Sequence, residues 1–292
     1  MTAPRPASPG ARLRARMAAG ETTVAPGAYD GMSARLIAQA GFPAVYASGG
    51  AISRSLAVPD LGLLSMNQVV DRVAAICEAV DLPVIADADT GYGNALNTQR
   101  AVQAFERAGA AAIHLEDQDF PKRCGHYDGK SLVSTAEMAQ KLRAARDACR
   151  DPDFVIIART DAIAVEGLDG ALARAAAYTE AGADVIFVEA PTSREQIERI
   201  AREVRGPKLI NMFHGGKTPI VPAEELARMG YGIVIIPSDL QRAAIHAMQA
   251  TLEAIRQDGT SMAVADRMVS FTQREAVIGT DAWLERDARY GA

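Results

Sequence analysis

The sequence predicts one (β/α)8 barrel, and three observations favour it. The chain has 292 residues, of which 49% are hydrophobic and 23% charged, enough for one large core and a usual size for such a barrel. Short apolar runs flanked by turn residues alternate with longer segments of helical period along the chain, which is the rhythm of βα units. The main alternative, a doubly wound open sheet, is disfavoured because no dinucleotide-type glycine motif lies near the N-terminus.

Eight apolar runs are the predicted strands. They cover residues 23–29, 44–48, 83–89, 111–117, 154–160, 184–190, 208–213 and 232–237. Four of these runs are preceded by a helical stretch that ends in a residue pair with glycine: Ala40-Gly41, Ala108-Gly109, Ala181-Gly182 and Met229-Gly230. Glycine suits the left-handed position just past a helix. The repetition therefore indicates one recurring structural unit.

The barrel is expected to form a single domain over residues 1–292, with an extension at each end. Roughly residues 1–20 are predicted to be an N-terminal extension and helix. Roughly residues 239–292 are predicted to be a C-terminal helical region, with one helix over 240–257 and further helix over 259–292. A helical tail of this kind often packs on a neighbouring subunit.

Charge and cysteine content argue against several classes of protein. The 31 basic and 36 acidic residues give a net charge of -5, and no basic run is interleaved with aromatics, so no nucleic-acid partner is expected. No stretch is apolar and long enough to span a bilayer, so no membrane association is expected. The three cysteines, Cys77, Cys124 and Cys149, are too few and too irregularly placed for a disulfide framework, which fits a reducing cytoplasm.

Polar residues gather at the carboxyl ends of the predicted strands, where barrel enzymes place their active sites. The set comprises Asp87, Asp89, Glu116, Asp117, Arg159, Asp161, Glu189 and Asn211. So many carboxylates at one mouth would repel one another unless a cation neutralised them. All-oxygen ligation, with no His or Cys at zinc spacing, favours Mg²⁺, and Mn²⁺ is the alternative. Strand alternation would aim Asp87 and Asp89 to the same side, as a shared metal site requires.

A thiol stands among three potentially cationic side chains after the fourth run, in the segment Pro121-Lys122-Arg123-Cys124-Gly125-His126. Such a setting raises the thiolate fraction and lets the group give or take a proton near neutrality. We therefore predict that Cys124 is catalytic, whereas Cys77 and Cys149 lie in Ala-rich helical stretches and are predicted to be structural. The loop residues His126 and His214 are further candidates.

Several of these motifs resemble the isocitrate lyase/phosphoenolpyruvate mutase superfamily over nearly the whole chain. The most specific are Asp87-Ala88-Asp89-Thr90-Gly91-Tyr92-Gly93, Leu115-Glu116-Asp117-Gln118 and Lys122-Arg123-Cys124-Gly125-His126. The last resembles the lyase signature of the superfamily. Similar substrate-binding elements are Ser48-Gly49-Gly50, Pro59-Asp60-Leu61-Gly62, Ala158-Arg159-Thr160-Asp161-Ala162 and Glu189-Ala190.

The resemblance implies a role for individual residues. Mg²⁺ would be held by Asp87 and Asp89, and by Glu116 through water. The catalytic residues would be Cys124, His126, Arg159 and Lys122. The substrate would be bound by Ser48, Gly49, Gly50, Asp60, Gly125, Glu189, Asn211 and Arg242. The resemblance further implies a homotetramer built as a dimer of dimers, a last helix swapped between subunits, and a mobile loop that carries Cys124 over the substrate.

The implied reaction is a retro-aldol-type cleavage of a small 2-hydroxy di- or tricarboxylic acid, of the 2-methylisocitrate or 2,3-dimethylmalate type. Chelation of the 2-hydroxyl and its carboxylate by Mg²⁺ favours collapse to a 2-oxo acid such as pyruvate. Cys124, helped by His126 and the cationic loop, would protonate the carbon that is released. The base that removes the hydroxyl proton is not assigned.

Two positions bear on the substrate. Arg242 falls where members that cleave a tricarboxylate have a carboxylate-binding Arg, but Phe271 stands where they have a second one. Because a tricarboxylate needs more cationic partners, an alkylated malate is favoured. The stretch Gly215-Gly216-Lys217-Thr218-Pro219 resembles carboxyphosphonoenolpyruvate phosphonomutase, which makes phosphorus-carbon chemistry the first alternative. An oxaloacetate hydrolase or decarboxylase and a non-catalytic carboxylate-binding barrel are the others.

Overall fold

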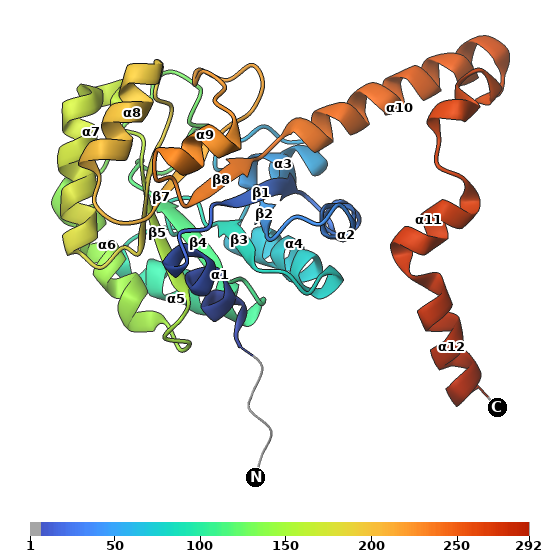
Figure 1. Cartoon of the computed structure of the whole chain (residues 1–292), viewed down its shortest axis with the longest axis horizontal. Coiled ribbons are helices and arrows are strands. Elements are labelled where there is room, and N and C mark those ends of the chain that lie inside the picture. Colours follow the sequence, from blue (N-terminus) through green and yellow to red (C-terminus); the bar gives the residue numbers. More distant parts are fainter. Residues whose placement is uncertain (1–6, 292) are drawn as a thin grey trace. The chain divides into compact units, whose positions relative to one another are not determined.

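The eight predicted strands close into one parallel barrel in the computed structural model, which describes residues 7–291 (Figure 1). The strands pair in chain order, and β8 returns to β1. They are β1 (Thr23–Ala28), β2 (Val45–Ala47), β3 (Val84–Asp87), β4 (Ala112–Glu116), β5 (Val155–Thr160), β6 (Val185–Val188), β7 (Lys208–Asn211) and β8 (Ile233–Ile236). The predicted barrel is therefore confirmed. Residues 1–6 of the predicted N-terminal extension lie outside the described residues.

Helices alternate with the strands and surround the barrel (Figure 1). They are α2 (Gly31–Gln39), α3 (Gly49–Ser55), α4 (Met66–Ala79), α5 (Ala95–Arg107), α6 (Thr135–Ala148), α7 (Ile163–Glu180), α8 (Arg194–Glu203) and α9 (Ala223–Arg228). The four glycines of the sequence repeat all have positive φ, from 80° at Gly41 to 100° at Gly182. Each follows the last turn of its helix, as the repeat predicted.

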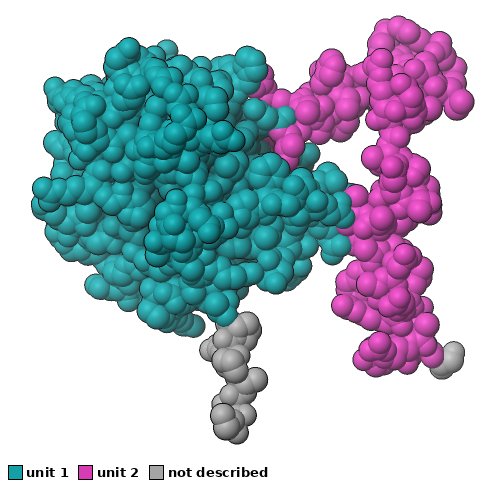
Figure 2. Space-filling view, in the orientation of Figure 1, with its two compact units in different colours: residues 1–239 teal, residues 240–292 magenta. Residues whose placement is uncertain are grey.

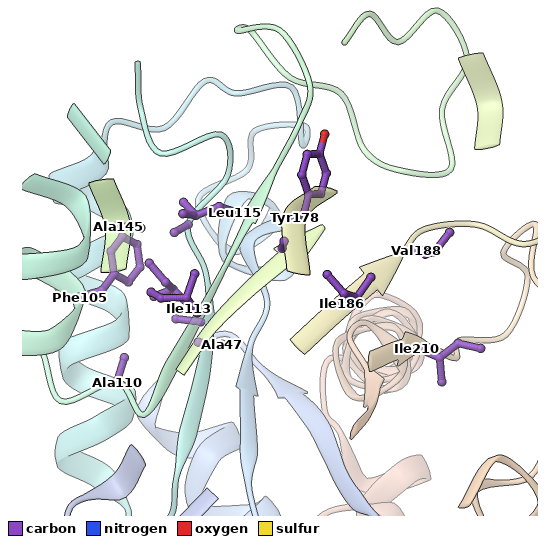
Figure 3. Close-up of a cluster of buried hydrophobic side chains, with 14 of the residues drawn as sticks. Ala47, Phe105, Ala110, Ile113, Leu115, Ala145, Tyr178, Ile186, Val188 and Ile210 are labelled. Atoms are coloured by element: carbon purple, nitrogen blue, oxygen red, sulfur yellow. The ribbon is translucent and has the colours of Figure 1, made fainter. Parts of the chain in front are cut away.

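Apolar side chains fill the space on both sides of the strands. Inside the barrel, Ile85, Ile157 and Leu209 form a buried cluster, and Leu13 of α1 (Pro9–Ala18) joins it. Between the barrel and the helices lies a second cluster, shown in Figure 3 with Phe105, Ile113, Leu115, Tyr178 and Ile186 among its members. Successive strand residues point to opposite faces. In β4, Ile113 and Leu115 therefore face the helices, whereas the alternate residues face the barrel interior.

Asp117 follows this alternation and points away from the mouth of the barrel. Its carboxylate accepts hydrogen bonds from the Thr160 hydroxyl (2.7 Å), the Asp161 backbone N–H (2.9 Å) and the Tyr178 hydroxyl (2.8 Å). The Arg174 guanidinium donates a further one at 3.2 Å. The inclusion of Asp117 in the carboxylate cluster at the mouth was therefore wrong. The residue instead ties β4 and β5 to α7.

The second compact unit, Leu240–Ala292, is helical and is coloured separately from Met1–Asp239 in Figure 2. It comprises most of α10 (Asp239–Asp258), a 3-10 turn (Met262–Arg267), α11 (Phe271–Ile278) and α12 (Thr280–Tyr290). Large apolar side chains are exposed on these helices, including Leu252, Phe271 and Trp283. Across the described part of the chain, no helix is both long and apolar enough to cross a membrane.

Removal of the Asp117 carboxylate should destabilise the fold. Asp117→Ala leaves the buried Arg174 guanidinium with one fewer counter-charge, so the free energy of unfolding should fall by about 3 kcal/mol, measured by urea denaturation. The exposed pair of Asp169 with Arg199 (2.6 Å) is the control, because Asp169→Asn should change stability by less than about 1 kcal/mol. Equal losses in the two variants would contradict the role of Asp117 as an anchor.

Candidate active site

The inward-facing residues at the carboxyl ends of the strands form one charged cluster. Asp87 ends β3, Glu116 ends β4 and Asn211 ends β7, while Arg159 is the next-to-last residue of β5 and Glu189 follows β6. All five are buried, with relative exposures of 8% or less. The structure therefore brings together the polar side chains that the sequence placed at this end of the barrel.

Asp87 and Asp89 are adjacent, but not for the reason that strand alternation suggested. β3 ends at Asp87, and Asp89 lies beyond it with a φ of 47°. In this left-handed turn the Asp89 backbone N–H donates a hydrogen bond to Asp87 Oδ1 (3.0 Å). A non-glycine residue at positive φ is strained. The turn, and not a continuing strand, brings Asp89 next to Asp87.

The ammonium of Lys122 lies between two acidic residues. Its Nζ atom forms ion pairs with Asp60 Oδ1 and with Asp89 Oδ1, the latter at 2.9 Å. Burial would lower the pKa of Lys122, but the neighbouring Asp89 and Asp60 raise it well above its usual value. Lys122 therefore stays charged and neutralises these two carboxylates.

Arg159 is the centre of the cluster. Its guanidinium lies 3.1 Å from Glu116 Oε2, 2.9 Å from Asp161 Oδ2 and 3.7 Å from Glu189 Oε1. One face stacks over the Phe187 ring, with 5.3 Å to the ring centroid. Burial would raise the pKa of Asp161, but Arg159 and Lys130 lower it to about 2. These contacts fix the orientation of the guanidinium.

His126 meets Glu189 on the other side of Arg159. Its Nδ1 atom accepts a hydrogen bond from the Lys217 backbone N–H (2.9 Å), and its Nε2 atom lies 3.3 Å from Glu189 Oε1. In a neutral ring the proton is then on Nε2, facing the carboxylate. The same Glu189 oxygen accepts a hydrogen bond from the Asn211 amide (3.3 Å).

Cys124 lies at this mouth, on the loop between β4 and α6 that we call the Cys124 loop (residues 118–133). Its backbone N–H donates to the Asp60 carbonyl (3.2 Å). Burial raises the pKa of the thiol, and the negative charges of Asp60 and Glu189 add to this effect. The expectation of an elevated thiolate fraction was wrong. The main reason is burial of the thiol, and the cationic charge of Lys122 is already paired with carboxylates.

Gly125 has no room for a side chain. A Cβ atom built there would collide with Glu189 Oε1 and would lie 2.5 Å from Arg159 Nη2. Gly49 is similarly close to Asp87, whose Oδ2 atom would be 2.5 Å from an added Cβ. Gly50 packs against Asp60, and Ser48 caps α3 by accepting a hydrogen bond from the Ala51 N–H (3.3 Å). The predicted residues from β2, β3 and the Cys124 loop therefore share one site. Arg242 lies in α10, within the second unit.

Two residues at the mouth, His114 and Lys130, were not identified from the sequence. His114 faces the barrel interior, where its Nε2 atom lies 2.8 Å from the Tyr46 hydroxyl and 3.6 Å from Asp87 Oδ1. Burial lowers the pKa of His114, which keeps the ring neutral. Lys130 pairs with Asp161 (3.0 Å). His114 interrupts an apolar run and could have been found by counting inward positions from Glu116, but no local signal marks Lys130.

The oxygen atoms at the mouth suit a hard cation. Burial raises the pKa of Asp89 to about 6 and that of Glu116 well above its usual value, so both carboxyl groups lack sufficient positive charge nearby. Glu116 Oε1, Glu189 Oε2 and Asn211 Oδ1 are buried without a hydrogen-bond partner. Within residues 7–291, no three His, Cys, Asp or Glu side chains are already grouped as a metal site. The available donors are all oxygen, as Mg²⁺ prefers.

The closed barrel and the charged cluster at the carboxyl ends of its strands are typical of (β/α)8-barrel enzymes, which place their active sites there. The chain belongs to the phosphoenolpyruvate mutase family, since the family model described as phosphoenolpyruvate phosphomutase matches residues 13–256. Its relatives include 2,3-dimethylmalate lyase of Eubacterium barkeri, 45% identical over 96% of this chain and 97% of that protein. The 2-methylisocitrate lyase of Aeropyrum pernix is 45% identical over 96% and 90%. These relatives support an enzyme of the carbon-carbon lyase type.

Solved structures agree with this family. A crystal structure of 2,3-dimethylmalate lyase superposes with a TM-score of 0.93 at 37% identity, covering 99% of this chain and 97% of that one. A phosphonopyruvate hydrolase in complex with oxalate and Mg²⁺ has a TM-score of 0.89 at 35% identity, covering 97% and 99%. At least one similar structure therefore contains a bound Mg²⁺ ion.

Gly125→Ala should impair turnover without unfolding the protein. The added methyl group pushes the Cys124 loop away from Glu189 and Arg159, and a shift of about 1 Å is expected to slow turnover by about 100-fold. Turnover is measured as release of a 2-oxo acid. Gly232→Ala is the matched control, since a Cβ there meets no atom nearer than 3.9 Å. Full activity of Gly125→Ala would show that the loop does not need this close contact.

Proposed function

We propose that this protein is a Mg²⁺-dependent lyase that cleaves an alkylated malate such as 2,3-dimethylmalate into a 2-oxo acid and a second carboxylic acid. The observation that carries the proposal is the docking of the Cys124 loop on the charged mouth, through Lys122 on Asp89 and through Gly125 on Arg159 and Glu189. The names of the relatives support the reaction class.

Asp87 and Asp89 would hold the metal ion, and Glu116 would reach it through water. The raised pKa of Asp89, about 6, fits this role because a bound cation replaces the protons of its ligands. When bound, Mg²⁺ supplies stabilisation of the negative charge that develops on the 2-oxygen of the substrate during cleavage. Mn²⁺ has the same preference for oxygen ligands and is the alternative ion.

Arg159 would bind a carboxylate of the substrate, since a guanidinium offers paired donors to such a group. Its Nε and Nη2 atoms are engaged by Asp161, so its remaining donors face Glu116 and the mouth. Gly49 and Gly50 would approach the substrate with backbone N–H groups, and Ser48 would do so with its hydroxyl, because its own N–H donates to the Ala28 carbonyl (3.2 Å). Asp60, Gly125, Glu189 and Asn211 would complete the pocket. The resemblance to the superfamily is the basis for proposing Arg242 as a further substrate-binding residue.

Cys124 would act as the acid, in its thiol form. When the carbon-carbon bond breaks, its electron pair stays on the carbon next to the second carboxylate, and the thiol transfers its proton to that carbon. The raised pKa of Cys124 keeps the proton in place until this step. His126 and Lys122 would hold the Cys124 loop on the mouth through Glu189 and Asp89, and Lys122 would neutralise the carboxylates that it contacts. The base that takes the 2-hydroxyl proton stays unassigned.

We also propose that the protein is a cytoplasmic homotetramer, a dimer of dimers, in which a C-terminal helix packs on a neighbouring subunit. The exposed Phe271, Trp283 and Leu284 of α11 and α12 support the packing, because apolar surface of this kind is usually covered by a partner. The three free cysteines fit a reducing compartment. Light scattering of the intact protein measures the assembly.

A substrate panel tests the proposed reaction. With Mg²⁺, we expect release of a 2-oxo acid from 2,3-dimethylmalate, with slower release from 2-methylisocitrate because the pocket has few cationic partners for a third carboxylate. EDTA should abolish the release, and added Mg²⁺ should restore it. Oxaloacetate, citramalate and a phosphonate complete the panel. Turnover of the phosphonate alone would favour the phosphonomutase alternative.

Cys124→Ser tests the acid. A serine hydroxyl is a far weaker acid than a thiol, so turnover should fall by about 100-fold or more. Binding of Mg²⁺ and of pyruvate, measured by calorimetry, should be retained because the metal and carboxylate ligands are unchanged. Cys149→Ser is the control, since Cys149 lies at the end of α6. Unchanged turnover in Cys124→Ser would remove the thiol from the mechanism.

The pH profile tests which form of the thiol is active. A raised pKa preserves the thiol at higher pH, so activity should persist above about pH 8.5, the usual thiol value, and fall only as the pH passes the raised pKa. The measurement is kcat at saturating Mg²⁺ from pH 6 upward. An activity that instead rises across the ordinary thiol pKa would mean that the thiolate is the required form.

A further inference from the structure

Lys130 is a buried cation on the return side of the Cys124 loop. Its Nζ atom donates one hydrogen bond to the Gly125 carbonyl and another to Asp161 Oδ1 (3.0 Å). The Lys130 side chain is 1% exposed and that of Asp161 is 0% exposed. Burial of an ammonium is costly unless it is paired and hydrogen-bonded, and here both requirements are met at the residue next to Cys124.

Other contacts hold the base of the loop but not its tip. At the base, two hydrogen bonds join the incoming and outgoing segments of the loop. The Asp119 N–H donates to the Ser131 carbonyl (3.0 Å), and the Val133 N–H donates to the Asp117 carbonyl (2.9 Å). The Gln118 side chain donates a hydrogen bond to the Arg123 carbonyl (2.8 Å) and accepts one from the Arg123 backbone N–H (2.9 Å). These contacts order the segments that lead to and from the tip, and they leave residues 124–130 to be placed by the surrounding barrel.

Contacts of Cys124, His126, Asp128 and Lys130 place the tip. The backbone of Cys124 is bonded to Asp60 (3.2 Å), and the backbone of Lys217 is bonded to His126 (2.9 Å). The outer ion pair of Lys217 with Asp128 is 37% and 95% exposed, so water and salt screen it and it contributes little. The Lys130 pair is the one that combines charge with full burial, and it acts on the carbonyl of the residue directly after Cys124.

Asp161 connects this contact to the substrate-binding guanidinium. Its Oδ1 atom accepts hydrogen bonds from both Lys130 (3.0 Å) and Arg159 Nη2 (3.1 Å). One carboxylate oxygen thus sets the position of the loop tip and of Arg159 together.

We propose that Lys130 is a positioning residue, which holds the tip of the Cys124 loop against Asp161 and so places the Cys124 thiol relative to Arg159. Lys130 itself does not contact the reacting atoms. The inference rests on the proposed function only in assigning the acid role to Cys124, because the position of the thiol can be measured without substrate.

Cys124 alkylation measures that position. Each variant is treated with iodoacetamide at one fixed pH, and the rate is followed for each cysteine by peptide mass spectrometry. In Lys130→Met the Gly125 carbonyl loses its donor and the tip is released, so Cys124 should react about tenfold faster or more, as expected for local opening. Cys77 and Cys149 are internal references, and their rates should not change.

Lys208→Met is the matched control. Lys208 is also a buried lysine whose Nζ atom donates to two backbone carbonyls, those of Val204 (3.2 Å) and Gly206 (3.0 Å), but it lies at the first residue of β7, remote from the carboxyl ends. Its variant should leave Cys124 alkylation and turnover as in the wild type. Equal effects of the two substitutions would overturn the inference, because the loss would then be general destabilisation.

Kinetics give the second readout. With 2,3-dimethylmalate as substrate, Lys130→Met should lower kcat by about 10- to 100-fold, the usual cost of a misplaced group, while KM changes by less than about threefold because the metal and carboxylate ligands remain. Lys130→Arg keeps a cationic donor. It should therefore recover part of kcat and part of the protection of Cys124 from alkylation. If Lys130→Met does not fold, Lys130→Arg replaces it as the test variant. Alkylation of Cys124 in Lys130→Arg as fast as in a denatured sample would then overturn the inference.

The two proposals fail separately. If the wild type cleaves no 2-hydroxy acid, the alkylation rates still report whether Lys130 holds the loop. If the wild type is active and Lys130→Met alkylates Cys124 at the wild-type rate, the positioning role is wrong and the lyase proposal stands.

Discussion

The burial of Arg159 among carboxylates is the interaction on which the candidate site depends. A guanidinium without water must be matched by negative charge, and Glu116, Asp161 and Glu189 supply that charge from three different strand ends. Asp161 and Glu189 also contact other residues, so the network of charged contacts extends outward from Arg159. Asp161 reaches Lys130, and Glu189 reaches His126 and Asn211. The geometry of the mouth is therefore set by the charge balance around one residue.

That balance is incomplete without a further cation. Among the described residues at the mouth, the acids Asp60, Asp87, Asp89, Glu116, Asp161 and Glu189 outnumber the bases Lys122, Lys130 and Arg159. Burial is the main cause of the raised pKa values of Asp89 and Glu116, and buried carboxylates hold protons where positive charge is lacking. A divalent ion with oxygen ligands would offset most of the excess, which connects the electrostatics of the fold to the metal dependence proposed for the reaction.

The Cys124 loop shows how tertiary contacts change the meaning of a motif. In the sequence, Lys122, Arg123 and His126 surround the thiol and suggest a stabilised thiolate. In the structure, Lys122 forms ion pairs with Asp60 and Asp89, and His126 faces Glu189. The thiol is left in a buried and negatively charged setting that keeps its proton. Such a group suits a proton donor better than a nucleophile, in agreement with an acid in a cleavage reaction.

Local sequence was sufficient for the barrel, its strand order and most of the residues at its mouth, because the periods of strands and helices and the turn residues between them are properties of short segments. It placed Asp87, Glu116, Arg159 and Glu189 correctly at strand ends, and it identified the loop that carries Cys124. The partner of each charge was decided only by the tertiary structure. Lys122 meets Asp60 across 62 residues of sequence, Asp117 turns outward to Arg174, and Lys130 meets Asp161. The physical reason is that the energy of a buried charge depends on burial and on distances between residues far apart in the chain, which no local pattern encodes.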